Sequence, residues 1–237
     1  MWNRRTILGA TTAVAIAPRA FAVGSATSSI NSIIDLHHDS RVEPGEAQRS
    51  GVSAIIHKST EGGDFTDGRY QDRKKSAKAL GLLWGSFHFA NDAPVSTQLK
   101  NYLDFTAPEA DEIMCLDFED HHGHEMSKAD AHTFIEGVRE ATRRYPMLYG
   151  GHWLRMQTGT KPDAIFAQCP LWYRRYAPRP IGIPTQIWDN YTLWQYTDGA
   201  NYGGPQNKVN GISCDRNLFR GTEAELRAAW PFTHVQA

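Results

Sequence analysis

The sequence predicts an α/β fold, an irregular TIM-like barrel in which five strand–helix units are followed by three strands with little helix between them. Up to residue 150, apolar runs of strand length alternate with helical stretches, a pattern typical of parallel α/β proteins. Beyond residue 150 the apolar runs continue, but Pro178, Pro180 and Pro184 leave little room for a helix. The 237 residues are enough for one such barrel, and the sequence shows no internal repeat or second domain.

The expected strands are short apolar runs separated by polar or turn-forming residues. The first five are Ser32–His37, Ser53–Lys58, Leu82–Phe89, Ile113–Glu119 and Met147–Gly150. The last three are Leu171–Tyr173, Leu193–Tyr196 and Ile212–Leu218. Closure of the barrel would make the first and the last of these strands neighbours.

Three helices are predicted between the early strands, and two of them have clear end signals. They are Tyr70–Leu80, Val95–Phe105 and Ala131–Arg144. Gly81 follows the first helix, at the position where glycine commonly ends a helix. Ser127 to Asp130 resemble a weak capping box before the third helix, and Pro146 follows its end.

The amino terminus has the features of an export signal. Arg4 and Arg5 precede a mildly apolar run and a small-x-small cleavage motif that ends at Ala22. The adjacent arginines resemble a twin-arginine signal, and about eleven apolar residues are too few to span a bilayer. We therefore expect a signal over residues 1–22, a linker over 23–30 and one catalytic barrel over 31–237, in an exported chain that is not inserted in the membrane.

Composition narrows the class of partner. The net charge of −1 gives no indication of nucleic-acid binding. Seven Trp and nine Tyr suit a sugar-stacking cleft as well as a core. Cys115, Cys169 and Cys214 allow at most one disulfide, whose pairing the sequence leaves open. We expect a monomer.

Two carboxylates lie two residues apart at the end of the fourth expected strand. On this strand Met114, Leu116 and Phe118 share one face, so Asp117 and Glu119 lie on the other. Alpha carbons at this spacing are about 6.5–7 Å apart, which lets two carboxyl groups reach one substrate bond in different protonation states. This arrangement suits the cleavage of a glycosidic bond. The alternative is an acidic strand end that faces solvent.

Three further acids are placed at strand ends. Asp35 ends the first strand, Glu61 follows the second, and Asp215 lies in the last. Polar residues at the carboxyl ends of barrel strands commonly form the active site. If Asp35 and Asp215 lie side by side, the pKa of one is raised and a proton donor results. Each acid alone could instead be a loop cap or a surface residue.

The histidines that follow the carboxylate pair do not have the spacing of a metal site. His121, His122 and His124 form a short cluster without a C-x-x-C or H-E-x-x-H motif. We expect a solvated loop there and no metal ligand.

Eight short motifs occur in the order found in glycoside hydrolase family 25, the Chalaropsis-type lysozymes, and the chain resembles this family over roughly residues 33–221. The motifs are Ile34-Asp35, Lys58–Gly62, Gly85–Phe89, Leu116–Glu119, Leu148–Gly150, Pro170–Trp172, Leu193–Tyr196 and Asp215–Phe219. The resemblance implies the same irregular barrel. It also implies hydrolysis of peptidoglycan at the β-1,4 bond between N-acetylmuramic acid and N-acetylglucosamine, without metal or cofactor.

Residue roles follow from the resemblance position by position. Glu119 corresponds to the general acid/base, and Asp117 to the partner that stabilises the oxocarbenium-like centre or orients the N-acetyl group. Asp35 and Asp215 correspond to further acids of the cleft. The positions implied to bind substrate are Glu61, His88, Tyr149, Trp172, Trp194 and Gln195.

The first loop departs from the family pattern. His37 stands where a small hydroxyl residue is usual, and the expected glutamine is missing after it. Two other classes of protein stay open. One is a non-catalytic glycan-binding barrel, and the other is a metal-dependent hydrolase that uses Asp35 with His37, His57 or His88. Whether hydrolysis would be retaining, inverting or substrate-assisted depends on the separation of the carboxyl groups in space.

Overall fold

The computed structural model describes residues 28–232. The expected export signal over residues 1–22, most of the expected linker and residues 233–237 lie outside this range. Ile30, the last residue of the expected linker, already belongs to the first strand. Between residues 28 and 232, none of the helices has the length and apolar character needed to cross a membrane.

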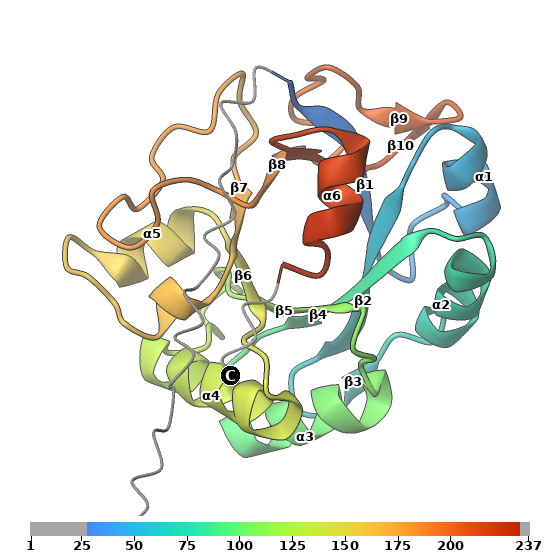
Figure 1. Ribbon diagram of the computed structural model, residues 1–237. Coiled ribbons are helices and arrows are strands. Elements are labelled where there is room, and N and C mark those ends of the chain that lie inside the picture. The colour runs from blue at the N-terminus through green and yellow to red at the C-terminus, as the bar shows by residue number, and fades with distance from the viewer. Residues whose placement is uncertain (1–27, 233–237) are drawn as a thin grey trace, which may run out of the picture.

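Eight strands close into a barrel (Figure 1). They are β1 (Ile30–Leu36), β2 (Ala54–Glu61), β4 (Leu83–Phe89), β5 (Ile113–Asp117), β6 (Met147–Gly150), β7 (Leu171–Arg174), β8 (Leu193–Thr197) and β11 (Asp215–Phe219). Neighbouring strands are parallel from β1 through β8, and β1 pairs with β2 to close the ring. The predicted irregular barrel is confirmed.

The last strand, β11, is antiparallel to both of its neighbours, β8 and β1. Asp215 at the amino end of β11 therefore pairs with Asp35 near the carboxyl end of β1. The expected side-by-side placement of these two acids is confirmed. Because β11 is antiparallel, Asp215 reaches this end of the barrel from the beginning of its strand, whereas the parallel strands reach it with their carboxyl ends. The predicted strand Ile212–Leu218 is divided, because Cys214 separates β10 (Ile212–Ser213) from β11.

Among the described residues, six helices accompany the barrel: α1 (Pro44–Arg49), α2 (Tyr70–Ala79), α3 (Val95–Thr106), α4 (Lys128–Thr142), α5 (His152–Thr158) and α6 (Glu223–Ala229). The three predicted helices correspond to α2, α3 and α4. Helix α4 begins three residues earlier than predicted, because Ser127 is its N-cap and accepts a hydrogen bond from the Asp130 amide. Three short elements complete the fold: β3 (Phe65–Thr66), η1 (Phe166–Gln168) and β9 (Lys208–Val209).

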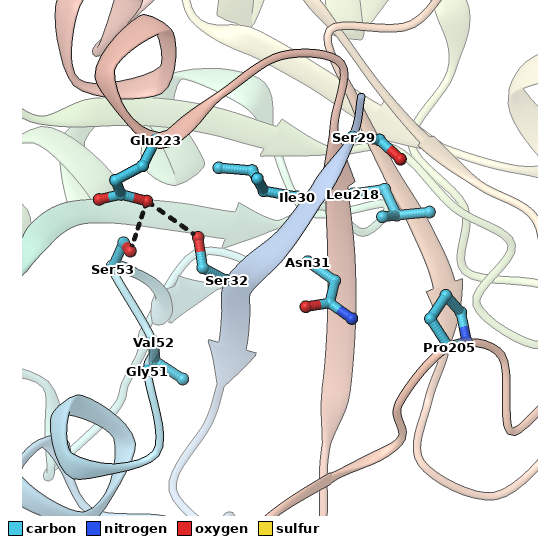
Figure 2. Close-up of a pocket in the computed structure, with 10 residues that line it drawn as sticks. All are labelled: Ser29, Ile30, Asn31, Ser32, Gly51, Val52, Ser53, Pro205, Leu218 and Glu223. Atoms are coloured by element: carbon cyan, nitrogen blue, oxygen red, sulfur yellow. Dashed lines mark hydrogen bonds between the residues drawn. The ribbon is translucent and has the colours of Figure 1, made fainter. Parts of the chain in front are cut away.

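Helix α6 lies across the end of the barrel where the parallel strands begin (Figure 1). Its Leu226 packs with Ile33 and Ile113 in the barrel interior. Figure 2 shows Glu223 of this helix accepting hydrogen bonds from Ser53 (2.7 Å) and Ser32 (3.3 Å). The cavity drawn there has a volume of about 700 Å³, but Glu223 is its one carboxylate and both hydroxyls already bind it. This end of the barrel therefore stabilises the fold.

The core has an inner and an outer layer, as strand alternation predicts. On β5, Cys115 faces the barrel interior with Ile113, while Met114 and Leu116 pack outward against α4. The three cysteines are all buried and free, so no disulfide forms among them.

Candidate active site

Four of the five predicted acids meet in one cavity at the end of the barrel opposite α6. This acid cavity has a volume of about 270 Å³. Its lining residues are Asp35, His37, Lys58, Phe87, Phe89, Asp117, Glu119, Tyr149, Trp172, Tyr176, Gln195 and Asp215. A second cavity of about 540 Å³, here called the side cavity, shares Asp35, His37 and Asp215 with it. The shared walls make the two cavities one groove.

The strand that delivers the acid pair ends earlier than predicted. Strand β5 ends at Asp117, so Glu119 lies two residues beyond it. The side chains still alternate between the inside and the outside of the barrel beyond this end. The Phe118 amide donates a hydrogen bond to the Tyr149 carbonyl (2.9 Å), which keeps the backbone alongside β6. The Phe118 ring is buried outside the barrel against Phe166. This anchor places Asp117 and Glu119 in the same cavity.

Arg174, at the end of β7, is the charged partner of Glu119. Its Nε lies 2.6 Å from Glu119 Oε1. Burial raises the pKa of Glu119 to about 7 although the charge of Arg174 acts in the opposite direction. Burial, and then the neighbouring charge of Glu119, raises the pKa of Asp117 well above its usual range. Glu119 is thus able to hold a proton near neutral pH and to release it within the groove.

The two remaining acids, Asp35 and Asp215, differ in the amide side chains that donate hydrogen bonds to them. Asp35 accepts hydrogen bonds from Gln195 Nε2 (3.0 and 3.1 Å) and from Asn217 Nδ2 (2.8 Å). Burial raises the pKa of Asp35, and these donors oppose that rise. Burial, followed by the charge of Asp35, raises the pKa of Asp215 well above its usual range. Asp35 is therefore the better candidate for the ionised carboxylate, and Asp215 for the protonated one.

Hydrogen bonds from aromatic residues hold this amide network in place. The hydroxyls of Tyr149 (2.6 Å) and Tyr176 (3.1 Å) donate to Gln195 Oε1. The indole of Trp172 donates to Asn217 Oδ1 (2.7 Å). Because each amide oxygen is occupied by a donor, the amide nitrogens are directed toward Asp35.

We expect Asp215→Asn to stabilise the fold at pH 8 by about 0.5–2 kcal/mol. The raised pKa means that native Asp215 binds a proton which the unfolded chain releases above about pH 4. The ionisation of Asp215 in the unfolded chain therefore lowers the free energy of unfolding as pH rises. Asparagine does not ionise, so the variant does not lose this stability. Urea unfolding of parent and variant at pH 8 and pH 3.5 measures the difference, which should disappear at the lower pH.

Asp198→Asn is the matched control for this prediction. Burial would raise the pKa of Asp198, but hydrogen bonds from the amides of Asn201 and Ala200 lower it overall. This substitution should therefore destabilise the fold at pH 8. If Asp215→Asn destabilises the fold to the same extent, Asp215 is not held protonated.

The predicted substrate-binding residues fall into three groups. Tyr149, Trp172 and Gln195 line the acid cavity. Glu61 lies beside it, where it forms an ion pair with the cavity residue Lys58. Two others, Trp194 and His88, are not brought into the cavity.

Strand alternation explains where Trp194 and His88 lie. Gln195 faces the acid cavity, so Trp194 is directed outward, and its indole donates to the Arg175 carbonyl (2.8 Å). His88 is likewise on the outer face of β4, bonded to Gln98 (3.1 Å) and stacked on Phe134.

Several cavity residues were not predicted as site residues. Phe87 and Phe89 flank His88 and face the acid cavity, so the same alternation could have indicated them. Tyr176, which follows β7, and Arg174, the last residue of β7 and the ion-pair partner of Glu119, come near the acids only because β7 pairs beside β6.

Two of the three histidines in the alternative of a metal-dependent hydrolase, His57 and His88, lie away from Asp35, whereas the third, His37, lines the acid cavity with it. His57 is stacked on Trp84 outside the barrel, and its ring nitrogens contact the Lys58 carbonyl (2.6 Å) and Arg73 Nη1 (3.1 Å). Burial lowers the pKa of His57 and of His88 to about 4. Both rings are buried and hydrogen-bonded, and the barrel wall separates them from Asp35.

A closed α/β barrel with a buried acid pair and a perturbed proton donor at its catalytic end defines a glycoside hydrolase of the barrel class. Residues 28–205 match the family model for glycosyl hydrolases family 25. The chain belongs to this family.

Three known proteins are similar to this chain over most of its length. Lysozyme M1 of Streptomyces globisporus is 26% identical over 226 residues, which are 85% of this chain and 71% of that protein. The N,O-diacetylmuramidase of Chalaropsis sp is 29% identical over 185 residues, 70% of this chain and 86% of that protein. The uncharacterized protein YegX of Escherichia coli O157:H7 is 25% identical over 175 residues, 72% of this chain but 60% of that protein.

Solved structures show the same barrel. The muramidase from Trichobolus zukalii has a TM-score of 0.71 at 26% identity, with 84% of this chain and 98% of that chain covered. The bacterial lysozyme from Streptomyces coelicolor has a TM-score of 0.73 at 23% identity, with coverages of 88% and 100%.

Proposed function

We propose that this chain is a muramidase that hydrolyses the β-1,4 bond between N-acetylmuramic acid and N-acetylglucosamine in peptidoglycan, with Glu119 as general acid/base. The observation that carries the proposal is the placement of Glu119 beside Asp117 in the acid cavity, with its pKa raised to about 7. The named muramidases and lysozymes among its relatives support the substrate class.

Proton transfer begins the proposed reaction. Protonated Glu119 donates its proton to the glycosidic oxygen, the C–O bond breaks, and the bonding electrons leave with the departing sugar. The positive charge on the remaining sugar is stabilised by the ionised Asp35 in the same cavity. A water molecule then adds to the sugar, and ionised Glu119 takes the proton of that water, which restores the enzyme.

Asp117 is suited to orient the substrate. Its Oδ1 is buried and has no hydrogen-bond partner among the described residues. A buried carboxyl oxygen without a donor is costly, so a substrate N–H that reaches it is bound favourably. The N-acetyl group of an amino sugar carries such an N–H. Tyr149, Trp172 and Tyr176 add aromatic surface for sugar rings along the cavity.

The proposed substrate lies outside the cytoplasmic membrane, which agrees with the expected export signal over residues 1–22. Replacing both Arg4 and Arg5 with lysine should then leave the chain inside the cell, as fractionation of a producing strain can show. We also expect a monomer, which sedimentation of the exported chain measures.

The direct test of the reaction is analysis of its products. Mass spectrometry of fragments released from a defined peptidoglycan should find muramic acid at the new reducing ends. Glucosamine at the reducing ends would instead indicate a glucosaminidase. Release of no fragments by the folded, exported chain would favour the non-catalytic glycan-binding barrel.

We expect Arg174→Met to move the alkaline limb of the pH profile of kcat/KM upward by about 1 pH unit. Without the guanidinium, burial of Glu119 is no longer opposed by a positive charge, so the pKa rises further above 7. The acid form of Glu119 then persists to higher pH. The exposed Arg179 provides the control, because Arg179→Met should leave the profile unchanged. An unshifted limb in Arg174→Met would show that another group sets it.

A further inference from the structure

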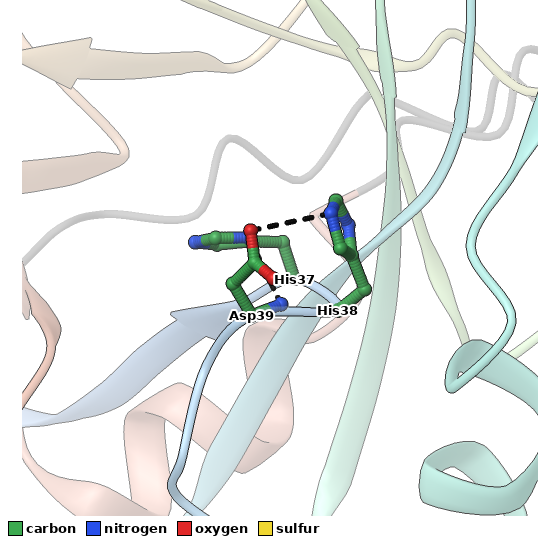
Figure 3. Close-up of side chains that lie close together, drawn as sticks. All are labelled: His37, His38 and Asp39. Carbon is green, nitrogen blue, oxygen red and sulfur yellow. Dashed lines mark hydrogen bonds and ion pairs between the residues drawn. The ribbon is translucent and has the colours of Figure 1, made fainter.

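The loop after β1 gathers three potential metal ligands at the edge of the groove. His37, His38 and Asp39 follow the strand directly, and one ligand atom from each lies within 4.8 Å of the other two (Figure 3). His37 lines both the acid cavity and the side cavity, and Asp39 lines the side cavity. The cluster lies where the sequence departs from the family pattern, and the proposed glycosidase reaction makes no use of it.

The spacing of these atoms suits a transition-metal ion. His38 Nε2 lies 3.3 Å from Asp39 Oδ2. Zinc–nitrogen and zinc–oxygen bonds are about 2.0–2.2 Å long, so two ligands of a tetrahedral ion are roughly 3.3–3.5 Å apart. His37 Nδ1 accepts a long hydrogen bond (3.4 Å) from the Asp39 amide, so its lone pair faces the cluster and a metal ion would take the place of that hydrogen bond. The three residues are partly or fully exposed, so their side chains are not fixed by packing.

A buried carboxylate gives independent support. Asp67 is fully buried, and its Oδ1 accepts a hydrogen bond from the Arg69 amide (2.9 Å). Its Oδ2 has no hydrogen-bond partner among the described residues and lies 3.6 Å from His38 Nδ1. His38 thus has a carboxylate on each side, Asp39 at Nε2 and Asp67 at Nδ1. Closing the 3.6 Å contact to hydrogen-bond distance gives the carboxylate–histidine–metal arrangement, in which the outer carboxylate fixes the tautomer and orientation of the ligating ring.

We propose that His37, His38 and Asp39 bind one divalent transition-metal ion, with zinc as the best match, and that Asp67 orients His38 for this purpose. Two imidazoles and one carboxylate favour zinc over magnesium or calcium, which prefer oxygen ligands. The charge of the adjacent Arg69 is offset by its ion pair with Glu43. Water can supply the fourth ligand, because His38 and Asp39 are exposed.

The test is calorimetric titration of the full exported chain with zinc chloride at pH 7, which requires no cell-wall hydrolysis. We expect one ion per chain, a loss of binding in His38→Ala and in Asp39→Ala, and about 10–100-fold weaker binding in Asp67→Asn. Cobalt in place of zinc should give the visible absorption of a tetrahedral site, and His38→Ala should abolish it. Thermal unfolding of each variant checks that it is folded.

His122→Ala and His124→Ala are the controls, because both rings are exposed on a different loop. They should bind zinc as the parent does. The proposal is overturned if the parent takes up no stoichiometric zinc. It is also overturned if the control variants lose as much affinity as His38→Ala, or if Asp67→Asn binds as tightly as the parent.

Discussion

Glu119→Gln should clear purified cell walls about 10²–10⁴-fold more slowly than the parent, the range that a general acid/base contributes to catalysis. Glutamine keeps the size of the side chain but has no proton to give to the glycosidic oxygen. Arg174 Nε, now 2.6 Å from Glu119 Oε1, would still have an oxygen nearby to bind. Turbidity of a wall suspension measures the rate, and co-sedimentation with walls measures binding.

Asp120→Asn is the control for this substitution. Asp120 is the next residue, its side chain is 58% exposed, and its Oδ1 lies 3.7 Å from Arg174 Nη2. This variant changes a carboxylate beside the same arginine without touching the acid cavity, and it should clear walls at close to the parent rate. If Glu119→Gln is as fast as the parent, the acid/base assignment is wrong. If parent and variant both bind walls and neither clears them, the chain is a glycan-binding barrel.

Phe118→Ala should lower the free energy of unfolding by about 3–5 kcal/mol, the usual cost of removing a buried phenylalanine ring. The ring is fully buried and packs against Phe166 and Trp153. It is also the outward anchor between Asp117 and Glu119, so its loss should slow wall clearing as well. Urea unfolding measures the stability, and turbidity measures the activity of the remaining folded protein.

Phe118→Leu is the control that keeps most of the buried volume of the side chain and removes only the aromatic ring. Leucine fills most of the same space, so its cost should stay below about 1.5 kcal/mol and the acid pair should remain in place. Equal destabilisation by alanine and leucine would show that the shape of the ring matters more than its volume. A Phe118→Ala variant that stays stable and clears walls at the parent rate would mean that the outer core does not hold the acid pair in place.

Local patterns in the sequence were sufficient for the parts of the fold that repeat. Strand length, turn residues and apolar alternation located the barrel strands, and three helices had enough length to show a period. Helices α1, α5 and α6 were not predicted, because six or seven residues make no more than two turns. Helix α6 forms because its Leu226, with Trp230 directly after its end, covers the barrel interior, in contact with strands such as β1 and β2 that precede it by more than 100 residues.

The site residues were predictable where local patterns or barrel closure bring them together, and not where they depend on contacts between distant segments. Strand alternation identified Asp117 and Glu119 as one pair, and barrel closure brought Asp35 to Asp215. Motif resemblance also included Trp194 and His88, although alternation places both outside the barrel. Arg174 could not have been predicted, because its contact with Glu119 joins two strands that are neighbours only through the intervening β6.

The sequence by itself determined the class of barrel, the order of its strands and the identity of the acids, because these follow from patterns a few residues long. The tertiary structure alone decided the direction of β11, which places Asp215 at the beginning of its strand and not at the end. It also decided which carboxyl groups of the groove hold a proton near neutral pH. Burial and charges from distant segments set each pKa, and the same carboxyl groups exposed to water would all be ionised at neutral pH.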